Sequence, residues 1–260
     1  MLKFQAKIVG FFNEYTVNTL PKSIILQGQM GSGRRTLIRE LCERLNIKIE
    51  EVNHQITIDD VFDYSTRLDK TMYIFHGDTM SVQSQNAILK FLEEPSENVF
   101  ITILCENLFS LLFTVRSRCC YYDMHMYSMD ELRTFTDDED LLSIADTPGD
   151  IEKLKGYNIG EYKTLATKII FNINRASLSN ILTLSKKISF SDDDKKLLPL
   201  FYFLKLMKNE AYNAYKNSGD YKFARFFYLI SGTKQDLLTP QVNQKQCFEN
   251  LLSAMHTEGK

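Results

Sequence analysis

Hydrophobic positions follow two alternating patterns in the first half of the chain. Short apolar runs are separated by segments in which apolar residues such as Leu37, Leu41 and Leu45 recur at helical spacing. Strands and helices that alternate in this way are typical of a parallel sheet covered by helices on both faces. We expect strands over residues 23–28, 49–52, 72–77, 99–104 and 119–126, and helices over 36–45, 59–68, 82–93 and, as a short turn, 108–112.

The strand pattern ends near Asp123. Residues 124–159 contain short amphipathic pieces separated by acidic or Pro-Gly turns, which are typical of a small helical domain. Residues 160–260 read as nearly all helix, with dense apolar faces, and predict a helical bundle. The predicted fold class is therefore α/β over residues 1–123, followed by a small helical domain over 124–159 and an all-helical domain over 160–260.

Composition narrows the classes of function. The chain has 260 residues, 44% of them hydrophobic, and a net charge of -2, so it can bury a sizeable core but lacks the basic excess of a strong autonomous nucleic-acid binder. No apolar run could span a bilayer, and Asn13 and Glu14 interrupt the first apolar segment where a signal peptide would be continuous. We expect a cytoplasmic protein without membrane contact.

The cysteines argue against a metal site. Their number is odd, and none forms a C-x-x-C pair of the kind that zinc and redox sites usually use. We therefore expect buried free thiols and no zinc. The cysteines are Cys42, Cys105, Cys119, Cys120 and Cys247.

A glycine-rich loop follows the first expected strand and precedes a helix, which is where a phosphate-binding loop belongs. It runs from Gly28 through Gly31 to Gly33, Arg34 and Arg35. In such loops backbone N–H groups hold phosphate, a lysine reaches the terminal phosphates, and a Ser or Thr hydroxyl binds Mg²⁺. Here Arg34 replaces the lysine and Arg35 replaces the hydroxyl. Thr36 is one position further along the helix, rotated by about 100°, and cannot simply take over the metal position.

The acids that a P-loop ATPase needs at the end of a neighbouring strand are also missing. Phe75 and His76 stand where the pair of acids is expected, and Asp78 comes two residues later. Three alternatives remain open at this point. The loop is a turn that binds nothing, it captures phosphate through its backbone and two arginines, or it is an active site with unusual ligands.

Three further motifs carry a resemblance to a known family. Residues 78–95, DTMSVQSQNAILKFLEEP, resemble the run that follows the acid strand in clamp-loader subunits, and residues 114–119, TVRSRC, resemble the S-R-C signature of the same proteins. Residues 243–252, ending in CFENLL, are similar to the last collar helix of the bacterial members, although Gln244 replaces a proline. The chain therefore resembles the delta-prime subunits of bacterial DNA polymerase III, which are AAA+ proteins.

The resemblance implies an architecture and a role. The first domain would be the AAA+ P-loop domain, the second the helical lid, and the third the collar through which subunits form a pentameric ring. Arg118, with Ser117 and Cys119 beside it, would reach in trans into the ATP site of a neighbouring subunit. The alternative for Arg118 is a surface arginine that pairs with nearby acids.

The combination of a decayed ATP site with a retained S-R-C motif resembles delta-prime subunits in particular. Glu152 stands where a sensor arginine would be expected, which points the same way. The resemblance implies an accessory subunit without enzymatic activity, with weak or no ATP binding. Its partners would be gamma/tau-like and delta-like subunits, the sliding clamp and primed DNA. Two alternatives are an active gamma/tau-like motor subunit, and a nucleic-acid-binding module without loader partners.

Overall fold

The computed structural model describes residues 2–175, 177, 183, 188–190, 197–237 and 242–258. The chain forms two compact units. We call the first, Met1–Phe135 with Asp146–Lys153, the sheet unit, and the second, Thr136–Ala145 with Leu154–Lys260, the helical unit.

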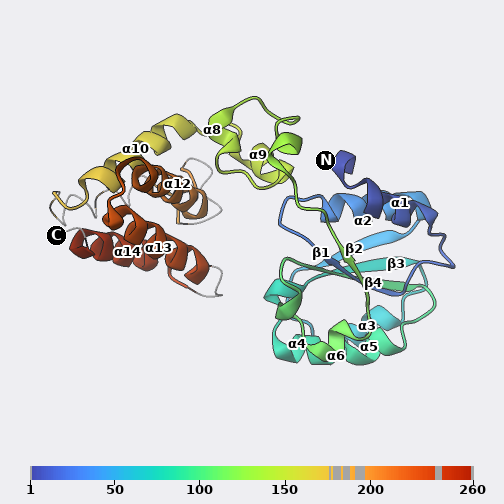
Figure 1. Ribbon diagram of the computed structural model, residues 1–260. Coiled ribbons are helices and arrows are strands. Elements are labelled where there is room, and N and C mark those ends of the chain that lie inside the picture. Colours follow the sequence, from blue (N-terminus) through green and yellow to red (C-terminus); the bar gives the residue numbers. More distant parts are fainter. Residues whose placement is uncertain are drawn as a thin grey trace. The chain divides into compact units, whose positions relative to one another are not determined.

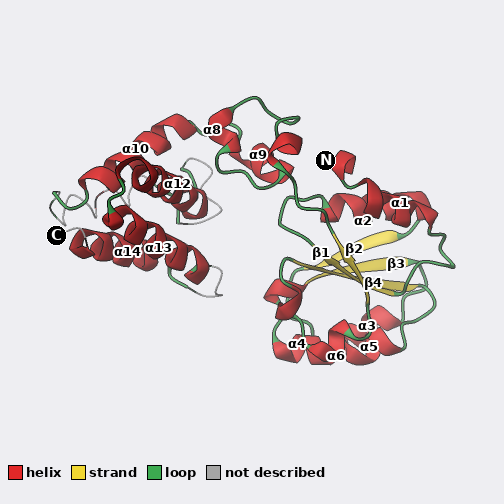
Figure 2. Cartoon of the chain, in the orientation of Figure 1, coloured by secondary structure: helices red, strands yellow, loops and turns green. Residues whose placement is uncertain are grey.

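The sheet unit is built on five parallel strands (Figure 2). They are β1 (Ser23–Gln27), β2 (Lys48–Val52), β3 (Thr71–His76), β4 (Val99–Cys105) and β5 (Cys120–Asp123), in the order β2-β3-β4-β1-β5. β1 lies between β4 and β5, with Ile25 paired to Ile103 on one side and to Tyr121 on the other. Because β1 has no sequence neighbour beside it, its carboxyl end opens at a switch in strand order, where ligands of parallel sheets usually bind.

Helices cover both faces of the sheet (Figure 1). One face packs on α1 (Ala6–Glu14) and α2 (Arg34–Leu45) through Phe12, Ile38 and their neighbours. The other face packs on α3 (Ile58–Ser65), α5 (Leu89–Glu93) and α6 (Phe113–Arg116) through Tyr64, Phe91 and Val115. The near-continuous burial of β1, β3 and β4 follows from this double cover.

The remaining short elements of this unit connect the layers. They are η1 (Leu2–Phe4), η2 (Gly77–Thr79), α4 (Val82–Ala87), η3 (Leu108–Ser110), α7 (Met129–Leu132) and α9 (Pro148–Leu154), whose last residue belongs to the helical unit.

The helical unit contains α8 (Glu139–Leu142), α10 (Ile159–Asn172), α12 (Leu200–Ser218), α13 (Tyr221–Asp236) and α14 (Gln244–Glu258). Its core is apolar and rich in aromatic rings, and Phe203 and Phe248 meet edge to face with their centroids 6.0 Å apart. Gly219 ends α12 in a left-handed conformation (φ 67°), which glycine adopts without strain.

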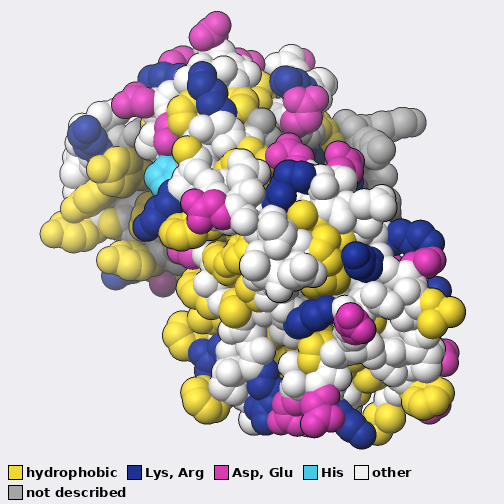
Figure 3. Space-filling model, turned by 90° about the vertical axis from the view of Figure 1, so that its right-hand side faces the viewer, with side chains coloured by type: hydrophobic (Ala, Val, Ile, Leu, Met, Phe, Trp, Pro, Cys, Tyr) yellow, Lys and Arg dark blue, Asp and Glu magenta, His cyan; other side chains and the backbone are white. Residues whose placement is uncertain are grey.

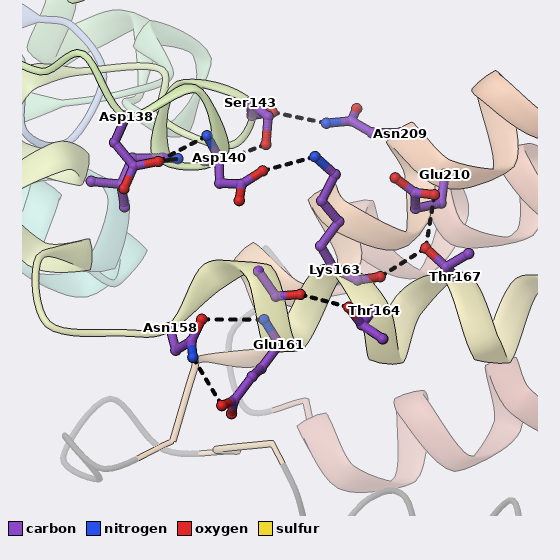
Figure 4. A network of polar contacts seen from close by, with 12 residues as sticks. Asp138, Asp140, Ser143, Asn158, Glu161, Lys163, Thr164, Thr167, Asn209 and Glu210 are labelled. Atoms are coloured by element: carbon purple, nitrogen blue, oxygen red, sulfur yellow. Dashed lines mark hydrogen bonds and ion pairs between the residues drawn. The ribbon is translucent and has the colours of Figure 1, made fainter.

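A polar network ties α8 and the residues after it to α10 and α12 (Figure 4). Lys163 Nζ lies 2.7 Å from Asp140 Oδ1, and Asn209 Nδ2 donates to the carbonyl of Ser143 at 2.8 Å. The Thr167 hydroxyl donates to Glu210 at 2.9 Å. Ser143, Lys163, Asn209 and Glu210 of this network line a hollow of about 280 Å³. Because these residues are bonded to other groups of the same unit, we interpret the network as packing between helices.

The predicted fold class, a parallel α/β domain followed by helices, is confirmed. The five expected strands are present within one to three residues of their predicted ends. The continuous helix predicted over 82–93 is wrong in one respect, because the chain turns at Ile88 and α4 and α5 are separate. Ile88 is completely buried, and this turn places it in the core beneath the sheet. The division at 123 and 159 stays a prediction, although residues 124–159 contribute to both units.

We predict that Phe248→Ala lowers the free energy of unfolding of the helical unit by about 3–5 kcal/mol, because truncating a fully buried ring leaves a cavity. Denaturant unfolding monitored by far-UV circular dichroism measures this loss. Tyr228→Ala is the matched control, since its ring is 75% exposed, and should change the same free energy by less than about 0.5 kcal/mol. Equal losses in the two variants would contradict the described core.

Candidate functional site

The loop between β1 and α2 has the backbone of a phosphate loop. Gly31 (φ 82°) and Gly33 (φ 104°) adopt left-handed conformations that other residues rarely take, and Gly33 is the N-cap of α2. The loop starts at Gly28, whose N–H donates to the carbonyl of Cys105 at the end of β4. The predicted loop residues are therefore brought together at the carboxyl end of the sheet.

The carbonyl groups of this loop are bonded to other parts of the sheet unit. The Thr147 hydroxyl donates to the carbonyl of Met30 at 3.1 Å, and the Gly149 N–H donates to the carbonyl of Gly31 at 3.1 Å. The Tyr127 hydroxyl donates to the carbonyl of Ser32 at 3.1 Å. The first turn of α9 therefore rests directly on the loop.

Contact between α9 and the loop depends on two glycines. A Cβ atom on Gly149 would lie 2.4 Å from the Cα of Gly31, which is closer than real Cβ contacts. Thr147 is 1% exposed, and its hydroxyl accepts the N–H of Asp150 while Asp150 Oδ2 accepts the N–H of Thr147. This reciprocal capping pair fixes the start of α9 against the loop.

A carboxylate lies on the N–H side of the loop. Glu106 Oε1 accepts the N–H of Met30 at 2.9 Å and lies 3.9 Å from Nη2 of Arg34. The Arg34 side chain is only 11% exposed. Burial lowers the pKa of its guanidinium from the ordinary value, and the carboxylates of Glu106 and Asp78 oppose that effect.

The positions that would hold Mg²⁺ and the attacking water are occupied by paired protein groups. Arg35, at the hydroxyl position of the loop, forms an ion pair with Glu51 of β2. His76, at the end of β3, has its Nε2 2.6 Å from the same Glu51 oxygen. Phe75, at the other acid position, is 1% exposed in the core. Thr36 lies half-buried in the first turn of α2.

Asp78 accepts hydrogen bonds from two backbone N–H groups. Its Oδ2 accepts the N–H of Glu106 at 2.7 Å, and its Oδ1 accepts the N–H of Asn107 at 3.2 Å. It therefore braces the turn that follows β4. In the part of the chain that the structure describes, no three His, Cys, Asp or Glu side chains gather as a metal site would require.

Arg118 lies in the turn between α6 and β5, with its side chain 32% exposed. Its Nε donates to Glu93 Oε1 at 2.6 Å, and its Nη1 donates to the carbonyl of Thr114 at 2.8 Å. These contacts correspond to the alternative of a surface arginine paired with an acid, and the role in trans stays a prediction. Ser117 is exposed, and Cys119 is half-buried.

The cysteines are free, but the burial expected for all of them holds only for Cys42 and Cys105. Cys119 and Cys247 are half-buried, and Cys120 is exposed on the edge strand β5. Burial raises the pKa of Cys42, Cys105 and Cys119 to about 12, so these thiols stay protonated near neutral pH and are poor metal ligands or nucleophiles. Among the described residues, no helix is long and apolar enough to cross a bilayer.

Charges of both signs are mixed on the face drawn in Figure 3, where Lys and Arg side chains are interspersed with Asp and Glu. With a net charge of -2, the chain offers little of the long-range attraction that phosphate backbones exert on basic proteins.

Two comparisons of the sequence with known proteins found matches to short segments of this chain. Residues 43–128 match the model of a family described as DNA polymerase III, delta subunit. The DNA polymerase III subunit delta' of Yersinia pestis is 40% identical over 53 residues, which make up 20% of this chain and 16% of that protein. The matched segment thus spans about a sixth of that relative.

Solved structures extend the likeness in fold to nearly the whole chain. The crystal structure of a DNA polymerase III, gamma subunit-related protein from Thermotoga maritima aligns over 98% of this chain and 99% of that one, with 16% identity and a TM-score of 0.52. A single-residue variant of RuvB from the same organism aligns over 80% of this chain and 69% of its own, with 14% identity and a TM-score of 0.46.

The fold over nearly the whole chain is therefore that of the Thermotoga gamma subunit-related protein, with a loop after β1 that has the backbone of a P-loop. Over the matched segments the chain is similar to subunits of DNA polymerase III, which confirms the resemblance found in the sequence.

The sequence predicted the position of the loop but not the residues that contact it and its arginines. It did not predict the contacts of Glu51, Glu106, Thr147 or Gly149. Only Glu106 carried a usable signal, because it directly follows the buried strand beside β1 and so had to end near the loop.

We predict that Gly149→Ala lowers the free energy of unfolding of the sheet unit by about 1–3 kcal/mol, because the new methyl group overlaps the backbone of Gly31. Chemical denaturation measures the change. Gly10→Ala in α1 is the control, since nothing lies within 4 Å of its Cβ position, and alanine in a helix interior should add about 0.5–1 kcal/mol. A neutral Gly149→Ala would argue that α9 does not rest on the loop.

Proposed function

We propose that this chain is a clamp-loader subunit of the delta-prime kind, without ATPase activity of its own. In this proposal it sits in a pentameric ring with gamma/tau-like and delta-like subunits in the cytoplasm, lends Arg118 in trans to a neighbouring ATP site, and helps load the sliding clamp on primed DNA. It requires no cofactor and no zinc, and it binds ATP weakly or not at all.

One observation carries the absence of ATPase activity. Arg35 and His76 stand where a P-loop ATPase places a metal-binding hydroxyl and an acid, and both contact Glu51. A guanidinium at the hydroxyl position repels Mg²⁺, and a phenylalanine in the core supplies no carboxylate in its place. Phosphoryl transfer in this class depends on Mg²⁺ to neutralise the developing charge. This argues against the alternative of a gamma/tau-like motor.

The position of Arg118 supports the role in trans. The residue lies in an exposed turn, and its pair with Glu93 is a surface ion pair, a kind of interaction worth about 0–1 kcal/mol. A neighbour's triphosphate carries more negative charge than one carboxylate, so Arg118 can exchange Glu93 for phosphate at low cost. The guanidinium is also the group best suited to bind a phosphoryl group at two oxygens.

We predict that Arg118→Ala slows ATP turnover by the partner ATPase subunits at the site it serves. An arginine finger contributes about 10³–10⁵ in rate, so single-turnover hydrolysis at that site should fall by at least about tenfold. The measurement uses the loader assembled from its purified subunits with clamp and primed DNA, and the chain alone should show no turnover.

Arg67→Ala is the matched control for this experiment. Arg67 is likewise an exposed arginine paired with a glutamate, Glu50, at 3.2 Å. It should leave turnover unchanged, and sedimentation should show that both variants assemble. Unaltered turnover in assembled Arg118→Ala loader would refute the role in trans, and hydrolysis by the chain alone would refute the accessory role.

A further inference from the structure

We infer that the Glu106 carboxylate acts as a built-in anion beside the phosphate loop. Its negative charge keeps phosphate out of the place where the terminal phosphates of a nucleotide would bind. The inference rests on the proposed function, because it gives a physical reason for a loop that does not use ATP.

The position of Glu106 is fixed by its own backbone. It is the first residue after β4, the strand that pairs with β1, so it lies at the same edge of the sheet as the loop. The two carboxylate oxygens of Asp78 accept the N–H groups of Glu106 and Asn107. The Gln27 amide donates to the carbonyl of Glu106 at 3.2 Å. The turn is thus held by Gln27 of β1 on one side and by Asp78, in η2 after β3, on the other.

Glu106 lies beside the groups that would hold a phosphate oxygen, with one hydrogen bond to the loop backbone and an ion pair to its basic residue. In a P-loop, backbone N–H groups and the basic residue at the start of the helix converge on the phosphates. Here a single oxygen, Glu106 Oε1, accepts the N–H of Met30 at 2.9 Å and faces Arg34 at 3.9 Å. Arg34 stands at the position of the basic residue.

Charge explains why this arrangement excludes phosphate. The Arg34 guanidinium is largely buried, and a buried cation requires a nearby anion. Glu106 supplies it from within the chain. A phosphate that entered would meet the carboxylates of Glu106 and Asp78, and like charges at such short range repel strongly. The Glu106 side chain is 43% exposed, so an incoming anion would approach it directly.

The test is binding of inorganic tripolyphosphate to the full chain, without Mg²⁺, by isothermal titration calorimetry. Glu106→Gln removes the charge while its amide oxygen can still accept the N–H of Met30, so the fold should persist. We expect the variant to bind at least about tenfold more tightly than the wild type. We also expect this gained binding to weaken with added salt.

Three further variants make the result specific. Glu94→Gln removes the same charge from an exposed residue after α5 and should behave as wild type. Glu106→Asp keeps the charge and should also behave as wild type. Adding Arg34→Ala to Glu106→Gln should abolish the gained binding, which shows that the anion binds in the loop.

The outcomes distinguish a failure of the role of Glu106 from a failure of the proposed function. Wild-type affinity in folded Glu106→Gln, or a gain that survives Arg34→Ala, would overturn the role of Glu106 and leave the proposed function standing. ATP hydrolysis by the wild-type chain would instead overturn the proposed function.

Discussion

A buried positive charge requires a negative partner, and this requirement organises the phosphate loop of the chain. Arg34 is the first residue of α2, directly after the loop, and 11% of its side chain is exposed. An active P-loop protein satisfies its basic residue with the phosphates of a nucleotide. Here the carboxylate of Glu106 lies beside the guanidinium, and the adjacent Arg35 pairs with Glu51. Two arginines that replaced a lysine and a hydroxyl thus have carboxylates of the same chain as their partners.

Other residues of the sheet unit also form hydrogen bonds with the loop. Thr147, Gly149 and Tyr127 bond successive carbonyl groups of the loop, and α9 begins directly on it. These bonds connect the start of α9 to the loop that follows β1. Arg118 makes none of these contacts and pairs with Glu93 and the carbonyl of Thr114 instead. Under the proposed function, the chain therefore presents Arg118 to a neighbour without using its own loop.

Sequence patterns predicted the local elements well and the long-range pairs poorly. Periodicity located all five strands, and the strand-to-helix pattern placed the glycine-rich loop at the end of β1. The shared partner of Arg35 and His76 could not be foreseen, because the register of β2 and β3 brings Glu51 near His76 while Arg35 meets it from α2. The break at Ile88 was missed since helix periodicity continues through a single turn residue. The contact of Gly149 with Gly31 joins positions more than a hundred residues apart and has no local signature.

Binding of Mg²⁺ and ATP to the wild-type chain tests the central claim most directly. Equilibrium dialysis of labelled ATP, with and without Mg²⁺, measures the affinity of the isolated chain. The account predicts no saturable binding at millimolar ATP and no effect of Mg²⁺. Tight binding that depends on Mg²⁺ would contradict it, because a metal-bound nucleotide cannot share the loop with Glu106 and the Arg35–Glu51 pair.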